Sequence, residues 1–296
     1  MIDRPRRAHE LPDRIVLATC RAWPELSASD RCLADSLERR GFRVESAWWN
    51  GPFESFDGAR GVVIRSTWDY HQALDAYRAW LERLDPPRVF NPPDLVRWNL
   101  EKTYLVELAA RGVPVPACAI AEAEPAAVAA ALDRLSLAEA VIKPTVGASG
   151  VGVERVARWR EADALARVRA VTRSPRLLIQ EFVPEVVDGE IAGVFFAGAF
   201  SHGLRRLPAA GEFRVNSQYG GVTEAVAVDH ATIEAMRQVL AALPHEPLYA
   251  RIDGVRRDGR FVLMEVEVNE PGLGLHLAAG AADRLAAALV ARLHAA

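Results

Sequence analysis

Short apolar runs separated by a helical pattern make up the first third of the chain. The runs lie at residues 14–20, 42–49 and 61–66. Between the first two, Leu33 and Leu37 recur at helical spacing in a segment that begins at Ser27 or Ser29 and ends at Gly41. Strand, helix and strand at these spacings predict a parallel sheet covered by helices.

The rest of the chain alternates helical and extended patterns in the same way. The turn at residues 91–93, Asn-Pro-Pro, predicts the end of the first unit near residue 92. Two stretches at residues 191–198 and 201–208 predict an antiparallel hairpin. Further helices are predicted at 74–84, inside the first unit, and at 98–111, 122–137 and 159–171 beyond it. Further strands are predicted at 177–183, 191–198, 201–208, 248–253 and 261–268.

Composition and charge narrow the class of protein. Half of the 296 residues are apolar and a quarter are charged, as in an ordinary globular protein, and the net charge of -3 favours neither nucleic-acid nor membrane binding. No apolar run reaches the ~18 residues of a spanning helix. The first residues lack the apolar core of a signal peptide, and the three cysteines form no CxxC pair. We therefore expect a cytoplasmic protein.

A lysine followed by a glycine-rich turn is the first candidate for chemistry. Lys143 ends an apolar strand, and Gly147, Ser149, Gly150 and Gly152 follow in a segment with little side-chain bulk. Backbone N–H groups of such a loop can approach an anion, and the lysine adds a full positive charge, which suits nucleotide phosphates. The spacing fits neither the P-loop, the dinucleotide-binding nor the kinase pattern. A tight turn without a ligand is the alternative.

Two polar segments are candidates for substrate contact. Arg65, Asp69 and Tyr70 follow the third strand, where ligands sit in open parallel sheets. Arg214 and Asn216 lie in a glycine-punctuated segment that is too polar to belong to the core. A solvated loop and a flexible connector, respectively, are the alternatives.

The last third carries a candidate metal site. Arg251 and Asp253 share one face of a strand, and Glu265, Glu267 and Asn269 share one face of the next. Antiparallel pairing is expected to bring Asp253 opposite the region of Glu267 and Asn269. Oxygen donors without histidine or cysteine suit Mg²⁺ and not Zn²⁺. A half-exposed hairpin with acidic side chains is the alternative.

Together these motifs, in this order, resemble the ATP-grasp ligases. The resemblance covers about residues 99–279 and is closest to bacterial glutathione synthetase, ribosomal S6 modification ligases and D-alanine-D-alanine ligase. The segments RSTWDY, NPPDLVRWN and FRVNSQYGG further resemble small bacterial ATP-grasp proteins related to the cyclo-ligase of D-cycloserine biosynthesis. The resemblance implies an α/β protein with α+β lobes: a parallel-sheet pre-ATP-grasp substrate domain (1–92) and central (93–184) and C-terminal (185–296) ATP-grasp subdomains.

The resemblance also implies roles for individual residues. ATP and Mg²⁺, with two metal ions, are the implied cofactors, and the family includes many dimers, so a homodimer is expected. The implied ligand sets are as follows: for ATP, Lys102, Lys143, the loop 147–152, Glu181, Val183 and Glu190; for the metal, Asp253, Glu267 and Asn269; for catalysis, Arg206, Arg214 and Arg251; for the substrate, Arg65, Asp69, Tyr70 and Asn216.

Two departures from the family pattern concern the substrate pocket. Glu270-Pro271-Gly272 stands where relatives have Ser/Thr-Pro, and the Lys-Arg pair that often follows the ribose-binding acid is missing. The implied activity is an ATP-dependent carboxylate–amine ligase that passes through an acyl phosphate and acts on small amino-acid-like substrates. The alternatives are an ATP-grasp phosphotransferase and a nucleotide-binding protein without catalysis.

Overall fold

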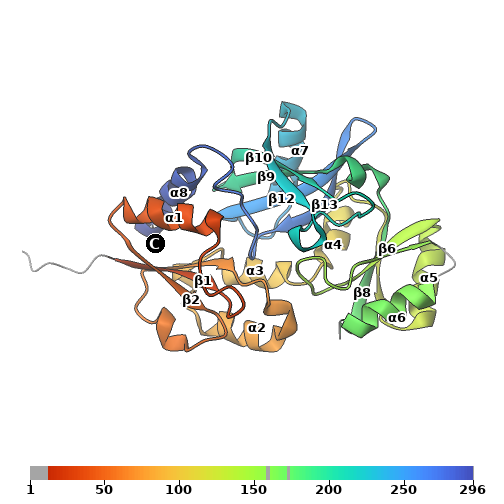
Figure 1. The fold of residues 1–296 in the computed structure, drawn as a ribbon, viewed down its shortest axis with the longest axis horizontal. Helices are drawn as coiled ribbons and strands as arrows, with labels where there is room; N and C mark the ends of the chain where they lie inside the picture. The colour runs from red at the N-terminus through yellow and green to blue at the C-terminus, as the bar shows by residue number, and fades with distance from the viewer. Residues whose placement is uncertain (1–12, 158–160, 172–173, 296) are drawn as a thin grey trace, which may run out of the picture.

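The strands that the structure describes form three sheets (Figure 1). The computed structural model describes residues 13–157, 161–171 and 174–295. The N-terminal sheet has the order β2-β1-β3-β4, and all of its pairs are parallel, as predicted. Its strands are β1 (Arg14–Thr19), β2 (Arg43–Trp48), β3 (Gly61–Ser66) and β4 (Val89–Phe90).

Helices in the N-terminal unit begin and end close to the predicted residues. The helix α1 (Ala28–Glu38) starts at Ser27, whose Oγ accepts a hydrogen bond from the Asp30 N–H at 3.1 Å. Gly41 follows the helix with a positive φ of 90°, a conformation that favours glycine. The predicted helix at 74–84 is α2 (Leu74–Arg83), which buries Tyr77, Trp80 and Leu81.

Two antiparallel sheets form the rest of the molecule. The central sheet, in the order β5-β8-β6-β7, is covered by α5 and α6, and the C-terminal sheet, in the order β11-β10-β9-β12-β13, contains the predicted hairpin as β9 and β10. The central elements are β5 (Cys118–Glu122), α5 (Pro125–Leu135), β6 (Glu139–Pro144), β7 (Glu154–Ala157), α6 (Glu161–Val171) and β8 (Arg176–Glu181). The C-terminal elements are β9 (Glu190–Phe196), β10 (Ala199–Leu207), β11 (Val222–Val226), α7 (His230–Ala241), β12 (Tyr249–Arg257), β13 (Arg260–Glu267) and α8 (Ala281–Ala295). Short 3-10 helices are η1 (Phe53–Phe56), η2 (Tyr70–Gln72), η3 (Pro86–Arg88), η4 (Pro184–Asp188) and η5 (Ser217–Tyr219).

The single helix predicted at 98–111 is wrong. Two helices stand there, α3 (Pro93–Asn99) and α4 (Tyr104–Ala110). The turn between them carries Lys102, whose backbone N–H donates to the Thr145 carbonyl at 2.7 Å. This bond ties the turn to the segment after β6, so the chain leaves the helix in order to place Lys102.

The last helix of the chain returns to the first unit. In Figure 1, α8 lies beside α1 at the N-terminal end of the molecule. Leu285 and Leu289 of α8 share one apolar core with Ile15, Leu33 and Leu37. Arg39 and Arg40 of the α1 end each donate to Asp283 at 3.1 Å. The first and last units are therefore joined by a common core.

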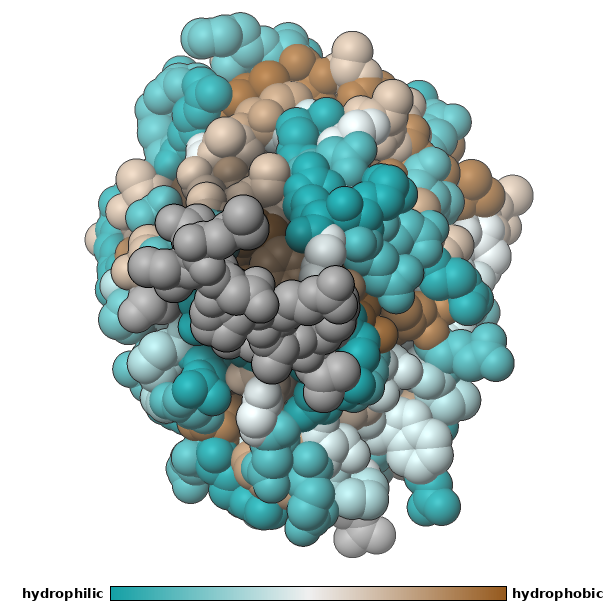
Figure 2. Space-filling model, turned by 90° about the vertical axis from the view of Figure 1, so that its left-hand side faces the viewer, coloured by the Kyte–Doolittle hydropathy of each residue, from teal (hydrophilic) through white to brown (hydrophobic). Residues whose placement is uncertain are grey.

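The surface is mixed in polarity, as expected for a chain in which half of the residues are apolar. Figure 2 shows hydrophilic residues interleaved with smaller hydrophobic areas on the face turned to the viewer. Within the described ranges, no helix combines the length and apolar character needed to cross a membrane.

Removing the Leu289 side chain is expected to destabilise the core that the first and last units share. Leu289 is fully buried, so Leu289→Ala should lower the free energy of unfolding by about 2–5 kcal/mol, through lost apolar burial and a residual cavity. Equilibrium denaturation measures the change. The exposed substitution His294→Ala on the same helix is the control, and it should stay within about 0.5 kcal/mol of the parent. Equal free energies of unfolding for the two variants would contradict a core shared by the first and last units.

Candidate active site

One cavity of about 910 Å³ is lined by residues from all three units. Lys102, Lys143, Glu265 and Glu267 line it together, although they come from different parts of the chain. The chain contains only two lysines, and both lie here. Elements from three units must therefore meet for this cavity to form.

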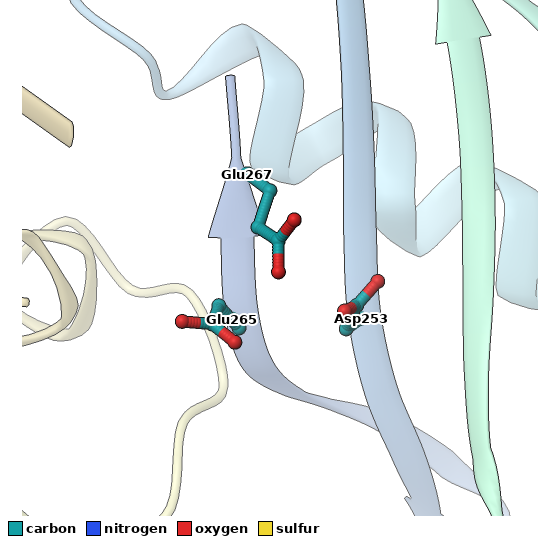
Figure 3. Close-up of side chains that lie close together, drawn as sticks. All are labelled: Asp253, Glu265 and Glu267. Carbon is teal, nitrogen blue, oxygen red and sulfur yellow. The ribbon is translucent and has the colours of Figure 1, made fainter. Parts of the chain in front are cut away.

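Three carboxylates converge on neighbouring strands at the cavity (Figure 3). Asp253 lies on β12, and Glu265 and Glu267 lie on β13. One carboxylate oxygen of each lies within 4.8 Å of the others. Such a group of hard oxygen donors fits Mg²⁺.

The predicted register of these strands is wrong. Asp253 lies opposite Glu265, and Arg251 lies opposite Glu267. Asp258 and Gly259, with φ of 51° and 76°, form the turn between the strands, and a bulge at Asp253 and Gly254 shifts the pairing by one residue.

Asn269 lies beyond the paired residues of β13 and does not belong to the residues that line the cavity. Its Oδ1 accepts a hydrogen bond from the Tyr77 hydroxyl at 2.7 Å, and its backbone carbonyl accepts one from the Tyr249 hydroxyl at 3.3 Å. Its buried Nδ2 has no hydrogen-bond partner among the described residues. In this structure Asn269 links the C-terminal unit to α2 of the first unit.

Two buried arginines neutralise Asp253. Arg206 donates to Asp253 Oδ2 at 2.7 Å and to Glu190 Oε2 at 3.2 Å. Arg251 donates to Asp253 at 2.8 Å and to Glu267 Oε1 at 2.5 Å. The Asp253 side chain is fully buried, so these contacts supply the charge balance that burial requires.

The two lysines differ in their surroundings. Lys102 Nζ donates to Glu265 Oε1 at 2.8 Å and to the Gly147 carbonyl at 3.1 Å. Burial opposes its charge, but the carboxylates of Glu265 and its neighbours raise the pKa of Lys102. Burial lowers the pKa of Lys143, which makes no hydrogen bond or ion pair with the residues the structure describes. Lys143 thus presents an unused ammonium group to the cavity.

Burial also shifts the pKa of the acidic groups in the cavity. Burial raises the pKa of Glu190 and of Glu267 to about 7, and that of Glu270 to about 8. Burial acts in the same direction on Glu265, but Lys102 and Lys143 outweigh it and lower its pKa to about 2. Glu265 is therefore the carboxylate most firmly held in its charged form.

The glycine-rich loop connects β6 and β7 and contacts a second loop, which contains Arg214, Asn216 and Tyr219. Ser149, Gly150 and Gly152 have positive φ angles of 58°, 71° and 71°. The Tyr219 hydroxyl donates to the Gly150 carbonyl at 3.1 Å, and a Cβ on Gly150 would lie 2.8 Å from Asn216 Oδ1. Glycine is required at this close approach.

Arg214 belongs to the same second loop and lines the cavity. Its guanidinium pairs with Glu212 at 2.6 Å and lies 3.6 Å from the centre of the Tyr219 ring. These contacts hold Arg214 beside the loop that carries Gly150.

Several apolar residues also line the cavity. They include Val141, Phe182, Val183 and Met264. The Val183 N–H, just past the end of β8, makes no hydrogen bond within the described part of the chain. Glu181 pairs with Arg257 at 2.8 Å, so its side chain is already occupied.

Of the residues predicted to touch substrate, some line the cavity and others do not. Arg65 and Tyr70 line the cavity. The Arg65 guanidinium is 1% exposed and donates to Asp30 Oδ1 at 2.8 Å and to the Pro271 carbonyl at 2.7 Å, so it positions other groups. Asp69 does not line the cavity, because its two oxygens accept from Trp49 Nε1 at 2.6 Å and Asn50 Nδ2 at 3.1 Å.

Some site residues were not selected by sequence reasoning. Glu265 was assigned to the right face, but the Asp258-Gly259 turn alone would pair Asp253 with Met264, and only the bulge brings Glu265 opposite Asp253. Glu270 was noted only as a departure from the family pattern. No local signal marks Asp30, because its role depends on contact with Arg65 and with the Ser66 hydroxyl at 2.6 Å.

Two family models match the chain. Residues 15–91 match the N-terminal domain of D-cycloserine synthetase DcsG, and residues 115–274 match the ATP-grasp domain of prokaryotic glutathione synthetase. The second match covers more than half of the chain.

Individual relatives agree with these models. The cycloserine biosynthesis protein DcsG of Streptomyces lavendulae is 31% identical over 278 residues, which are 88% of this chain and 92% of that protein. The crystal structure of D-cycloserine synthetase DcsG superposes with a TM-score of 0.82 and 28% identity, covering 95% of this chain and 99% of that chain. D-alanine–D-alanine ligase of Bacillus anthracis shares the fold, with a TM-score of 0.69 and 16% identity over 96% of this chain and 98% of that chain.

The chain therefore belongs to the ATP-grasp family. It is an ATP-dependent carboxylate–amine ligase that acts on small molecules, as the resemblance in its sequence implied.

Because the chain has only two lysines, their ionisation can be measured directly. After reductive methylation with ¹³C-formaldehyde, NMR should show two lysine signals besides the terminal amine. A lysine is charged below its pKa, so the Lys143 signal should lose its charge at lower pH than an ordinary lysine, and the Lys102 signal at higher pH. Lys143→Arg assigns the signals. The reverse order of titration would contradict the described electrostatics.

Proposed function

We propose that the enzyme converts the carboxylate of a small amino-acid-like substrate into an acyl phosphate with the terminal phosphoryl group of ATP. An amine then attacks the acyl carbon and displaces phosphate, which leaves an amide and ADP. A carboxylate resists attack by an amine, so this activation is the step that the protein must support. Phosphoryl transfer depends mainly on positioning and on neutralising charge.

The unpartnered ammonium group of Lys143 is the observation that best supports this proposal. A half-buried lysine without a carboxylate partner favours the binding of an anion, and the glycine-rich loop follows it in the cavity lining. Lys102, held by Glu265, lies on the other side of the same loop through its bond to Gly147. We assign both lysines to the phosphates of ATP.

The converging carboxylates fit Mg²⁺. We propose Asp253, Glu265 and Glu267 as the protein ligands, and we replace Asn269 by Glu265 because Glu265 converges with the other two carboxylates whereas Asn269 does not line the cavity. Bound Mg²⁺ would neutralise phosphate charge, and three carboxylates leave room for the two ions that the family resemblance implies. Arg206 and Arg251 keep the Asp253 carboxylate fixed between the strands.

The nucleotide base and sugar have candidate contacts next to the lysines. The apolar side chains of Val141, Phe182 and Met264 suit contact with a flat base. The Val183 N–H, which makes no hydrogen bond within the described residues, can donate to the edge of that base. Glu190, bound by Arg206, is proposed to accept hydrogen bonds from the ribose hydroxyls.

Loop contacts and the first unit are proposed to complete the substrate site. The loop that carries Arg214 and Asn216 closes against Gly150, which would shield an acyl phosphate from water. Tyr70 extends into the cavity from the first unit. The proposal includes a cytoplasmic enzyme, in keeping with three free cysteines, and a homodimer.

The test of this proposal is a screen of carboxylic acids with hydroxylamine as the amine. The enzyme should release ADP and phosphate and form a hydroxamate only when acid, ATP and Mg²⁺ are all present. ADP release with phosphate transferred to a hydroxyl would instead identify a phosphotransferase. Turnover of an amino acid without any added amine would show that the substrate supplies its own amine. The mass of the product then separates ring closure, suggested by the relative named for D-cycloserine synthesis, from the joining of two molecules.

Loss of the Lys143 charge should slow catalysis. Lys143→Ala should lower kcat/KM by about 10²-fold or more, as loss of a single transition-state contact does. Lys143→Arg keeps the charge but not the compact geometry, and should recover part of the rate. The exposed Arg237→Ala is the control. Normal turnover by Lys143→Ala would refute the assignment.

The metal ligands can be told apart by their Mg²⁺ requirement. At saturating ATP, Glu265→Gln should raise the Mg²⁺ concentration for half-maximal rate by at least ~10-fold, the smallest cost of a damaged metal site. Asn269→Ala should mainly lower stability, because it removes the acceptor of Tyr77. The opposite outcome would restore Asn269 as the ligand.

A further inference from the structure

Glu270 differs from the other carboxylates that line the cavity. Glu181, Glu190, Glu265 and Glu267 each form an ion pair with an arginine or a lysine. Among the described residues, the Glu270 side chain forms no ion pair and accepts no hydrogen bond from another side chain. A carboxylate that is largely withdrawn from water and unpaired is unfavourable unless a ligand supplies the missing cation.

Glu270 lies where a substrate must bind. It follows Glu267, whose charge raises the pKa of Glu270 second only to burial, so the two carboxylates are neighbours. Its backbone carbonyl accepts from Trp68 Nε1 at 3.0 Å, which fixes the segment against the first unit. The Tyr70 hydroxyl lines the same cavity and makes no hydrogen bond within the described ranges. An unpaired carboxylate and a hydroxyl without a hydrogen bond therefore belong to the lining of the same cavity, and the Glu270 charge acts on Tyr70.

The neighbouring cations are already committed. Lys102 is bound to Glu265, Arg251 to Asp253 and Glu267, and Arg65 to Asp30. In its charged form Glu270 therefore has no partner side chain, and a bound cation can supply one. An ammonium group is suitable, because its three donors can reach a carboxylate and a hydroxyl at once.

We propose that Glu270 binds the ammonium group of an amino-acid substrate whose own carboxylate is the group activated by ATP. This inference rests on the proposed function and specifies its substrate class. In an α-amino acid the nitrogen and the carboxylate are attached to the same carbon, so a carboxylate beside the metal site places the ammonium close to Glu270. The Tyr70 hydroxyl oxygen accepts a hydrogen bond from the same ammonium group.

Paired substrates separate this role from a structural one. The hydroxamate assay is run with the common amino acids in both configurations, each beside its deaminated acid, such as alanine with propionate and serine with 3-hydroxypropionate. The parent enzyme should prefer an amino acid over its deaminated partner. Glu270→Gln should lower kcat/KM for that amino acid by at least ~30-fold and leave the deaminated acid and the KM for ATP unchanged, since only the ammonium contact is lost.

Matched variants control for charge and folding. Glu246→Gln removes the same charge from an exposed site and should have no effect. Glu270→Asp keeps the charge and should recover part of the rate, and Glu270→Gln should retain the thermal midpoint of the parent. If deaminated acids are used as well as amino acids, or if Glu270→Gln affects both equally, the inference fails while the ligase stands. If no acid supports phosphate release, the proposed function fails, and this inference with it.

Discussion

The convergence of like charges at the strand pair β12 and β13 is the constraint on which the structure depends. Asp253, Glu265 and Glu267 repel one another, and Asp253 is fully buried. Such a cluster is tolerable only when cations reach it, and these come from β10, β12 and the turn before α4. The contacts between the units are thus required by the electrostatics of the cavity as well as by apolar burial.

The choice between arginine and lysine follows the same logic. Of the 36 basic residues, only Lys102 and Lys143 are lysines. Arginine remains charged when buried and can hold two carboxylates at once, as Arg206 and Arg251 do. A lysine presents a compact charge whose pKa responds to burial, as the lowered pKa of Lys143 illustrates. The arginines fix the protein's own carboxylates, whereas Lys143 is left for a ligand.

Local patterns predicted much of this architecture. The parallel sheet, the hairpin of β9 and β10 and the helix begun by Ser27 follow from spacing and capping, and they were confirmed. The bulge beside Asp253 and the turn at Lys102 were not predictable from local sequence, because each depends on a partner strand or a distant carbonyl. The family resemblance named both lysines and the acidic strand, but the register decided which carboxylates meet. Asp69 illustrates the same limit, since Trp49 and Asn50 draw it away from the cavity.

The central claim is that this charge cluster transfers a phosphoryl group from ATP to a carboxylate oxygen. It is tested most directly with a substrate acid enriched in ¹⁸O at its carboxylate, turned over in ordinary water, with the released phosphate analysed by mass spectrometry. The account predicts one ¹⁸O atom in each phosphate, because the oxygen that bridges carbon and phosphorus leaves with phosphorus when the amine attacks. Unlabelled phosphate from a reaction that forms the amide would contradict it, because the carboxylate oxygen lost on amide formation would then have left by another route.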